Sequence, residues 1–369
     1  MARLQKILIL PIVALISACA TTDEIAQSGA AWATLSGEAP LIIAHRGASG
    51  YLPEHTLEAY ALAIEQGADV IEPDLVFTKN GVLVARHDRY LSTTTNVADL
   101  AEFADRRRVN PDTNDDPRDD WWVEDFTLAE MKTLRARQPF EGRSKEFDDQ
   151  YLIPTFDEVL ALIERKAKDA GRPVGVYPET KHPGFFASIG YDFERPLLTA
   201  LQGFRAGPVF IQSFEPEILK RLKGKTTAKL VQLVYEETPG AGPNIPLEEI
   251  AKYADGVGPA KALMWDSQSE FLLSSFFFDA KDAGLLLHVW TLRNDSPDLR
   301  LQEWAREGLI RRYGLKPNVP TLWSELIYPE IIIESEVFEY EVYLKSGVDG
   351  IFTDFPDTAV QVRDNMHSK

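Results

Sequence analysis

The sequence predicts an α/β fold, a (β/α)8 TIM barrel, and three observations support this prediction. A strand, an amphipathic helix and a second strand follow one another from Leu41 to Asp74, and such a unit makes the neighbouring strand parallel. Further short apolar runs recur at intervals suited to the same unit. Several of these runs end in charged residues, as expected where a barrel carries its active site. The eight candidate strands are 41–45, 68–74, 174–179, 209–213, 230–235, 256–258, 285–290 and 348–353.

Two helices have clear signals at their ends. Thr56 is the predicted N-cap of the first helix, and Gly67 ends it. Its apolar residues recur at helical spacing: Leu57, Tyr60, Ala61 and Ile64. A second helix is predicted over 154–168, with Thr155 as its cap.

A polar turn after the second strand predicts a β-hairpin extension of the barrel. Asn80 and Gly81 between two β-type runs are a strong hairpin signal. Pairing across this turn brings His87 to a position approximately opposite Asp74. The returning run is therefore an arm of the hairpin and does not count as a barrel strand.

Two long insertions are predicted, at about 89–152 and 296–346. In the first, residues 128–137 are expected to form a helix. Its acidic segment 110–120 is expected to be a solvated loop rather than a cation site. In the second, the apolar run 331–333 is expected to pack under the insertion rather than face a partner.

The N-terminus is expected to lie outside the barrel domain. Residues 1–19 are predicted to be a lipoprotein signal peptide with its lipidation site, 20–40 a flexible tether, and 41–369 the barrel domain. The sole cysteine, Cys19, ends a segment that resembles the bacterial lipoprotein processing site. The alternative is an ordinary signal peptide cleaved after small residues. The expected location is the bacterial cell envelope, as a periplasm-facing lipoprotein, and Ala20 after the cysteine resembles an outer-membrane destination.

The charge of the chain restricts its partners. A formal net charge of −18 argues against nucleic acid or an anionic membrane surface as the main partner. A membrane is therefore expected to be contacted only through a lipid anchor. An anionic substrate would be repelled by the overall field, so a local cation must attract it.

Several motifs together resemble one enzyme family. They are HRGASGYLPEHT, EPDL, TKNGVLVARHD, YPETK, QSFEP, HVWTLRND and GVDGIFTDFPDTAV. From about Leu41 to Arg363 the chain resembles a glycerophosphodiester phosphodiesterase of the bacterial periplasmic type. The resemblance implies metal-dependent hydrolysis of small glycerophosphodiesters, such as glycerophosphocholine and glycerophosphoethanolamine, to glycerol 3-phosphate and an alcohol. It also implies that Glu72, Asp74 and Glu179 hold the metal. His55 is a departure, because the family usually has Asn there.

The carboxylates themselves point to a cation. Glu72 and Asp74 alternate on one strand and face the same way, and Glu179 ends the next strand. Three hard oxygen donors suit one divalent cation, Ca²⁺ or Mg²⁺, rather than Zn²⁺. The alternative is a set of rim carboxylates paired with Arg46 and Lys181. The side chains of Arg46 and Lys181 suit phosphate oxygens. Together with these two side chains, the three carboxylates carry a net charge of −1 without the metal ion and +1 with it. Only the site that holds the ion is therefore expected to attract a phosphodiester.

His45 and His87 are the predicted general acid and base, in an order that remains open. The attacking oxygen belongs either to water or to the glycerol hydroxyl of the substrate.

Phe214 and Trp290 stand at strand ends and are predicted to line the alcohol pocket, with simple packing as the alternative. Two other functions remain open: phospholipase D-like or lyase activity on intact phospholipids, and head-group binding by a non-catalytic lipoprotein.

Overall fold

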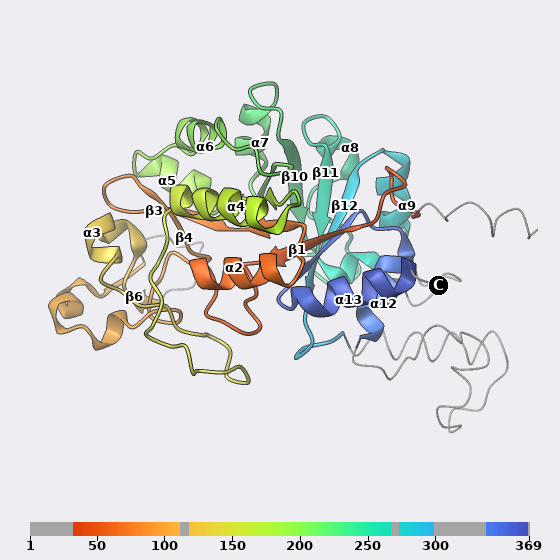
Figure 1. Cartoon of the computed structure of the whole chain (residues 1–369). Helices are drawn as coiled ribbons and strands as arrows, with labels where there is room; N and C mark the ends of the chain where they lie inside the picture. Colours follow the sequence, from red (N-terminus) through yellow and green to blue (C-terminus); the bar gives the residue numbers. More distant parts are fainter. Residues whose placement is uncertain (1–31, 111–117, 267–272, 299–336, 368–369) are drawn as a thin grey trace, which may run out of the picture.

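The computed structural model describes residues 32–110, 118–266, 273–298 and 337–367, and within these the strands form a closed barrel (Figure 1). Two barrel strands are each split at a proline, which lacks the N–H needed for the ladder. Pro73 separates β2 (Val70–Glu72) from β3 (Asp74–Phe77). Pro178 follows β7 (Gly175–Val176) and precedes β8 (Glu179–Thr180). Because β2 pairs with β7 while β3 pairs with β8, the two halves keep one ring continuous.

The ring contains eight strand positions, all joined in parallel. Besides the two split strands they are β1 (Leu41–His45), β9 (Phe210–Ser213), β10 (Lys229–Val234), β11 (Gly256–Pro259), β12 (Leu286–Leu292) and β13 (Gly350–Thr353). Pairing of β13 with β1 closes the ring. The predicted TIM barrel is therefore confirmed, and every predicted strand has its counterpart.

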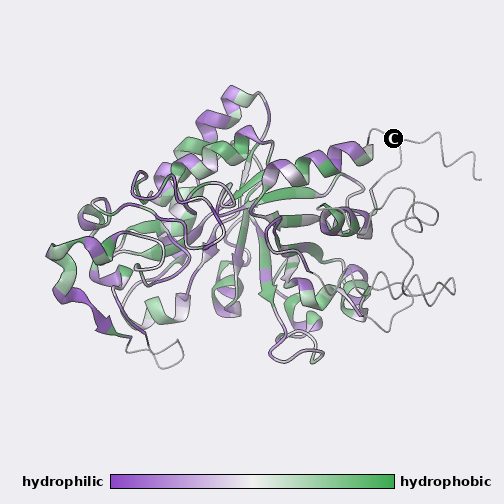
Figure 2. Cartoon of the chain, turned by 90° about the horizontal axis from the view of Figure 1, so that it is seen from below, coloured by the Kyte–Doolittle hydropathy of each residue, from purple (hydrophilic) through white to green (hydrophobic). Residues whose placement is uncertain are grey.

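Helices cover the outside of the barrel (Figure 1). Thr56 caps α2 (Leu57–Glu65) through Ala59 N, and Thr155 with Glu158 forms a capping box at α4 (Phe156–Ala170), so both predicted caps are confirmed. The other α-helices are α5 (Pro183–Ser188), α6 (Glu194–Leu201), α7 (Pro216–Leu222), α8 (Leu247–Ile250), α9 (Ser275–Asp282), α12 (Phe338–Ser346) and α13 (Pro356–His367). A short 3-10 helix, η4 (Lys261–Met264), follows β11. Figure 2 shows apolar strands at the centre, surrounded by helices with polar and apolar faces.

The hairpin forms as predicted, with a small difference in register. Its second arm, β4 (Leu83–Ala85), pairs antiparallel with β3, and Leu75 lies opposite Ala85. Arg86 therefore lies opposite Asp74, with its N–H donating to Asp74 O at 3.0 Å. His87 comes one residue further along.

The first insertion contains short elements rather than a long helix. They are η1 (Val97–Asp99), η2 (Ala101–Arg106), β5 (Arg108–Val109), β6 (Asp119–Asp120), η3 (Val123–Asp125) and α3 (Leu128–Met131). The prediction of a helix over 128–137 was wrong beyond Met131. After Met131 the chain pairs with a segment that is distant in the sequence. Ala136 forms an antiparallel β-bridge with Thr95, and Asn96 N donates to Arg135 O at 3.1 Å. Most of the second insertion, including 331–333, lies outside the described residues, as do 111–117.

The chain enters the barrel at the amino-terminal ends of the strands. Leu35 N donates to Asp349 Oδ1 at 2.7 Å, and Asp349 immediately precedes β13. On α9, which lies beside this segment in Figure 1, Lys281 Nζ donates to Ala33 O at 2.5 Å. The part of the predicted tether that is described, from Trp32 onward, thus contacts the barrel. No helix among the described residues is long and apolar enough to cross a bilayer.

Candidate active site

A cavity of about 310 Å³ lies at the carboxyl ends of the barrel strands. Its lining includes predicted site residues from six parts of the chain: His45, Arg46, Glu72, His87, Glu179, Lys181, Phe214 and Trp290. Asp74 is buried next to Glu179, its partner in the sheet. Cys19 lies outside the described residues. The lining also contains polar residues to which no role had been assigned: Gln212, Thr291 and Arg293, which lie within the quoted motifs, and Lys261, which does not.

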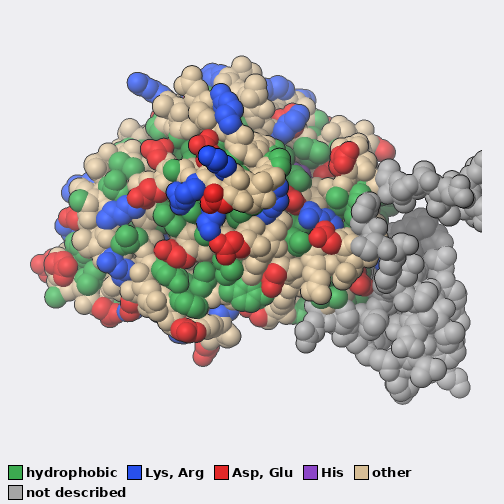
Figure 3. Space-filling view, viewed as in Figure 1, with side chains coloured by type: hydrophobic (Ala, Val, Ile, Leu, Met, Phe, Trp, Pro, Cys, Tyr) green, Lys and Arg blue, Asp and Glu red, His purple; other side chains and the backbone are tan. Residues whose placement is uncertain are grey.

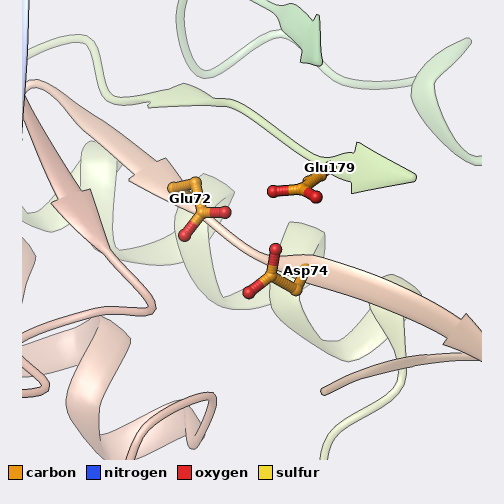
Figure 4. A group of neighbouring side chains, drawn as sticks. All are labelled: Glu72, Asp74 and Glu179. Atoms are coloured by element: carbon orange, nitrogen blue, oxygen red, sulfur yellow. The ribbon is translucent and has the colours of Figure 1, made fainter. Parts of the chain in front are cut away.

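Three carboxylates converge beside this cavity. Glu72, Asp74 and Glu179 are all buried, and each offers an oxygen within 4.8 Å of the others (Figure 4). Glu72 ends β2, Asp74 begins β3 and Glu179 begins β8, so the breaks at the two prolines bring all three to one point.

Burial makes three negative charges at this point unfavourable. Burial, with the charges of Asp74 and Glu179, raises the pKa of Glu72 well above its usual value. Burial likewise raises the pKa of Glu179 to about 8. Burial also acts to raise the pKa of Asp74, but Lys181 and the hydrogen bond to His55 outweigh it and hold that pKa well below the usual value. Three ionised carboxylates therefore require a cation between them.

The hydrogen bonds of this group leave room for such a cation. Glu72 accepts from Arg46 N at 2.8 Å and from Gln212 Nε2 at 3.2 Å. Asp74 Oδ1 is buried and has no hydrogen-bond partner among the described residues. A buried orphan oxygen beside two further carboxylates fits the oxygen donors that Ca²⁺ and Mg²⁺ take.

Arg46 and Lys181 supply the positive charge of the site. Arg46 Nη1 donates to Glu54 Oε2 at 2.9 Å, and Arg46 Nε lies 3.4 Å from Asp74 Oδ2. Lys181 Nζ lies 2.9 Å from Glu179 Oε1. The sequence alternative of rim ion pairs is thus present in part, but these two cations cannot balance three carboxylates.

A turn with close backbone packing presents Arg46. Arg46 has a φ of +59°, and Gly47, which follows it, has a φ of +87°. A Cβ on Gly47 would lie 2.7 Å from the backbone of Ala59 on α2, so the close approach requires glycine.

Each predicted catalytic histidine is held by an aspartate. His45 Nδ1 lies 2.6 Å from Asp354 Oδ1, and His87 Nδ1 lies 2.7 Å from Asp88 Oδ1. Each aspartate thus holds one ring nitrogen and leaves Nε2 on the far side of the ring. Burial lowers the pKa of His45 to about 4, and Arg46 adds to this shift. Burial also lowers the pKa of His87, and Arg46 and Lys181 contribute.

The two aspartates had no predicted role. Asp88 directly follows His87 in the sequence, so the adjacent pair is a signal that could have indicated it. Asp354 directly follows β13, at the carboxyl end of a barrel strand, where functional residues are expected.

Aromatic rings form the apolar side of the cavity. The rings of Phe214 and Trp290 meet edge to face with their centroids 5.7 Å apart. Trp290 Nε1 donates to Gly258 O at 2.8 Å, which fixes the indole. Lys181 Nζ lies 5.7 Å from the centre of the Phe214 ring. Both rings line the cavity and also pack on each other, and their contact with the alcohol stays a prediction.

The outer surface carries no obvious extension of this site in the view of Figure 3, where side chains of both charge signs are interspersed. This face therefore presents no field of a single sign that would steer an anion.

Comparison with known proteins agrees with the geometry. Residues 45–358 match the model of the glycerophosphoryl diester phosphodiesterase family. A glycerophosphodiester phosphodiesterase of Arabidopsis thaliana is 33% identical over 345 residues, which cover 86% of this chain and 84% of the relative. One from Haemophilus influenzae is 30% identical, with 87% of this chain and 89% of the relative covered.

A solved structure shares the fold. It is a phosphodiesterase of Oleispira antarctica in complex with the product sn-glycerol-3-phosphate, with a TM-score of 0.56 and 19% identity. The match covers 90% of this chain and 99% of that one. Because the family model spans most of the chain and the relatives match over most of their length, the chain belongs to the glycerophosphoryl diester phosphodiesterase family and is a phosphoric diester hydrolase.

Proposed function

We propose that this enzyme hydrolyses glycerophosphodiesters, such as glycerophosphocholine and glycerophosphoethanolamine, to glycerol 3-phosphate and an alcohol, with one divalent cation, Ca²⁺ or Mg²⁺. The observation that carries the proposal is the convergence of Glu72, Asp74 and Glu179 beside a cavity that also contains two histidines. The product named for the Oleispira enzyme, sn-glycerol-3-phosphate, supports this substrate class.

The residues divide into three groups with different tasks. Glu72, Asp74 and Glu179 would hold the cation, which when bound polarises a phosphoryl oxygen as a Lewis acid. Arg46 and Lys181 bind the phosphate oxygens, Arg46 through its planar fork and Lys181 as a point charge.

The surroundings of the two histidines support a division of labour between them. Asp354 Oδ2 accepts from Arg143 Nη2 at 2.6 Å and from Arg293 Nε at 2.7 Å, so much of its charge is already balanced. His45 is therefore kept neutral and can take a proton from the attacking oxygen, as a general base.

His87 differs from His45 in the further partners of its aspartate, although burial, Arg46 and Lys181 lower the pKa of this ring as well. Among the described residues, no arginine or lysine forms an ion pair with Asp88. The charge of Asp88 is thus available to stabilise an imidazolium at His87, which can protonate the leaving alcohol as a general acid. The attacking oxygen is that of water or of the glycerol hydroxyl; in the second case a cyclic phosphate forms first and can be trapped by rapid quench.

Metal removal tests the proposed function. Dialysis against chelator should abolish release of glycerol 3-phosphate from glycerophosphocholine, because the Lewis acid that polarises the phosphoryl oxygen is then lost. Added Ca²⁺ or Mg²⁺ should restore it. Asp74→Asn should lose activity while its circular dichroism stays unchanged. Full activity in excess chelator would overturn the metal assignment.

The same assay separates the remaining alternative. A phospholipase D-like or lyase activity requires phosphatidylcholine to be turned over at least as fast as glycerophosphocholine. The non-catalytic binding alternative is not retained, because the chain belongs to an enzyme family.

We also propose that the enzyme is anchored in the bacterial cell envelope through a lipid on Cys19, which lies outside the described residues. Cys19→Ser should move the protein from the membrane fraction to an unprocessed or soluble form, because a thioether-linked lipid needs the sulfur. A wild-type protein with a free thiol at Cys19, or with Thr21 as its N-terminus, would contradict the proposal.

A further inference from the structure

His55 is a buried side chain with contacts on both of its ring nitrogens. Its side chain has no exposed surface, its Nε2 lies 2.9 Å from Asp74 Oδ2, and its Nδ1 lies 2.7 Å from the hydroxyl of Tyr60. Tyr60 belongs to α2 and is also fully buried. The imidazole thus connects a helix on the outside of the barrel to one carboxylate of the proposed metal site.

The partners of His55 define its tautomer. An ionised carboxylate can only accept a hydrogen bond, so Nε2 must carry the hydrogen that faces Asp74. Nδ1 then accepts from the hydroxyl of Tyr60. A neutral ring with one donor and one acceptor is fully satisfied by these two contacts, which hold it in a single orientation.

The backbone supports the same arrangement. His55 has a φ of +57° and Arg46 a φ of +59°, both in the left-handed region that side chains rarely adopt. His55 N donates to Arg46 O at 3.1 Å, so the two unusual residues are joined. Such conformations persist where surrounding contacts determine them, and they concentrate at functional sites. Here both side chains converge on the same atom, Asp74 Oδ2.

This convergence gives the two oxygens of Asp74 different surroundings. Oδ2 accepts a hydrogen bond from His55 Nε2 at 2.9 Å and lies 3.4 Å from Arg46 Nε, an ion-pair contact, whereas Oδ1 is buried without a hydrogen-bond partner among the described residues. In Figure 4 one oxygen of Asp74 is directed toward Glu72 and Glu179. Rotation of the carboxylate would take the acceptor away from a buried donor, which is costly.

We propose that His55 is a positioning residue of the metal site, which fixes the carboxylate of Asp74 so that Oδ1 is presented to the cation. This inference rests on the proposed function, because it assumes that Asp74 is a ligand. Hydrogen bonds to the far side of a metal ligand orient it, and their loss weakens metal binding by about 10–100-fold.

Calcium affinity tests the inference without substrate. The metal-free wild type, His55→Leu and His55→Asn are titrated with Ca²⁺ by isothermal calorimetry, after circular dichroism has shown that each is folded. His55→Leu removes the donor and should bind Ca²⁺ about 10–100-fold more weakly. His55→Asn keeps a donor and tolerates the left-handed backbone, so it should stay closer to the wild type.

A second pair of variants separates positioning from packing. Tyr60→Phe removes only the hydroxyl that holds the ring, and it should also weaken Ca²⁺ binding, by less than His55→Leu. His288→Leu is the matched control: His288 is equally buried in the barrel interior and bonded to a tyrosine, Tyr177, at 2.9 Å. It should lower the melting temperature and leave Ca²⁺ affinity unchanged.

A kinetic readout should agree with the calorimetry. His55→Leu should raise the Ca²⁺ concentration needed for half-maximal activity, and its kcat at saturating Ca²⁺ should approach the wild-type value.

The outcomes are distinguishable. If the wild type binds no Ca²⁺ or Mg²⁺, the proposed metal site itself fails. If the wild type binds and His55→Leu and Tyr60→Phe bind equally well, the positioning role is overturned. It is also overturned if His288→Leu weakens binding as much as His55→Leu, because the effect would then come from loss of stability.

Discussion

The pairs His45–Asp354 and His87–Asp88 have almost the same hydrogen-bond length, 2.6 and 2.7 Å, but they are built in different ways. Asp354 lies 309 positions from His45 in the sequence, and its side chain is only 1% exposed. Asp88 is the next residue after His87, and its side chain is 23% exposed. A short hydrogen bond alone therefore does not define the role of either histidine.

The difference lies in what else each aspartate contacts. Arg143 and Arg293 both donate to Asp354, and Arg143 comes from the first insertion. The first insertion therefore contributes a side chain beside the cavity, and the positive charge of Arg143 helps to balance the negative charge of Asp354, which contacts His45. Asp88 forms no ion pair with an arginine among the described residues, and its nearest charged partner is His87, with Arg46 and Lys181 acting on it from further away. The two aspartates thus differ in how far arginines share their charge, and this difference is the basis of the proposed division into base and acid.

The largest expected effect comes from removing either ring. His45→Ala and His87→Ala should each lower kcat on glycerophosphocholine by at least about 10²-fold, with the stability of the barrel little changed. The fold-decrease in kcat of the double variant should be much smaller than the product of the two single fold-decreases, because both rings act on one transition state. Steady-state kinetics with thermal melts measures both quantities. Unchanged activity in both single variants would mean that the cluster is structural.

An activated leaving group should then distinguish the two histidines. With p-nitrophenol as the leaving group, protonation by a general acid is nearly dispensable. His87→Ala should recover much of its rate on this substrate, and His45→Ala should not. Equal recovery in both variants would remove the division between acid and base.

The two aspartates should differ in their effect on stability. Asp354→Asn removes the charged partner of Arg293 and one of the two charged partners of Arg143, whose other partner is Asp295 at 2.7 Å, and breaking such buried pairs costs about 3–5 kcal/mol. Asp88→Asn, at a more exposed pair, should cost less than about 1 kcal/mol. Urea unfolding of the metal-loaded proteins measures the difference, and equal losses would contradict the contrast between the two sites.

The smallest expected effects are shifts of the pH profile. Because burial lowers the pKa of His45 to about 4, the acidic limb of kcat/KM should lie near pH 4 rather than 6.5. Arg143→Met removes a positive charge beside Asp354, which favours the imidazolium and should move this limb to higher pH by about one unit. Asp88→Asn removes a negative charge beside His87, so the basic limb should move to lower pH. If both variants shift the same limb, the two histidines do not have separate roles.

Local patterns were sufficient for much of the barrel. Apolar runs that end in charged residues located the strands, and Thr56 and Thr155 located two helix starts, because these signals act between near neighbours in the sequence. The helix expected over 128–137 failed for the opposite reason. Pairing of Ala136 with Thr95, a contact across the insertion, overrides the local preference.

The same distinction applies to the site. His45, Glu72 and Asp74 could be predicted because each stands at the end of an apolar run. The partners that set their chemistry, Asp354 and Arg143, are brought in by the closed barrel and by the folded insertion. The end of an apolar run could have indicated Asp354, but no spacing in the sequence shows that Asp354 and Arg143 meet behind His45.

The attachment of residues 32–40 to the amino-terminal ends of the strands has a consequence for orientation. Leu35 is bonded to Asp349 at one end of the barrel, and the cavity lies at the other. Residues 20–31 can extend by at most about 43 Å. With the lipid proposed above on Cys19, the anchor would therefore join the barrel at its base, at the end opposite the cavity. The mouth of the barrel would stay clear of this attachment, so that molecules dissolved in water could enter it.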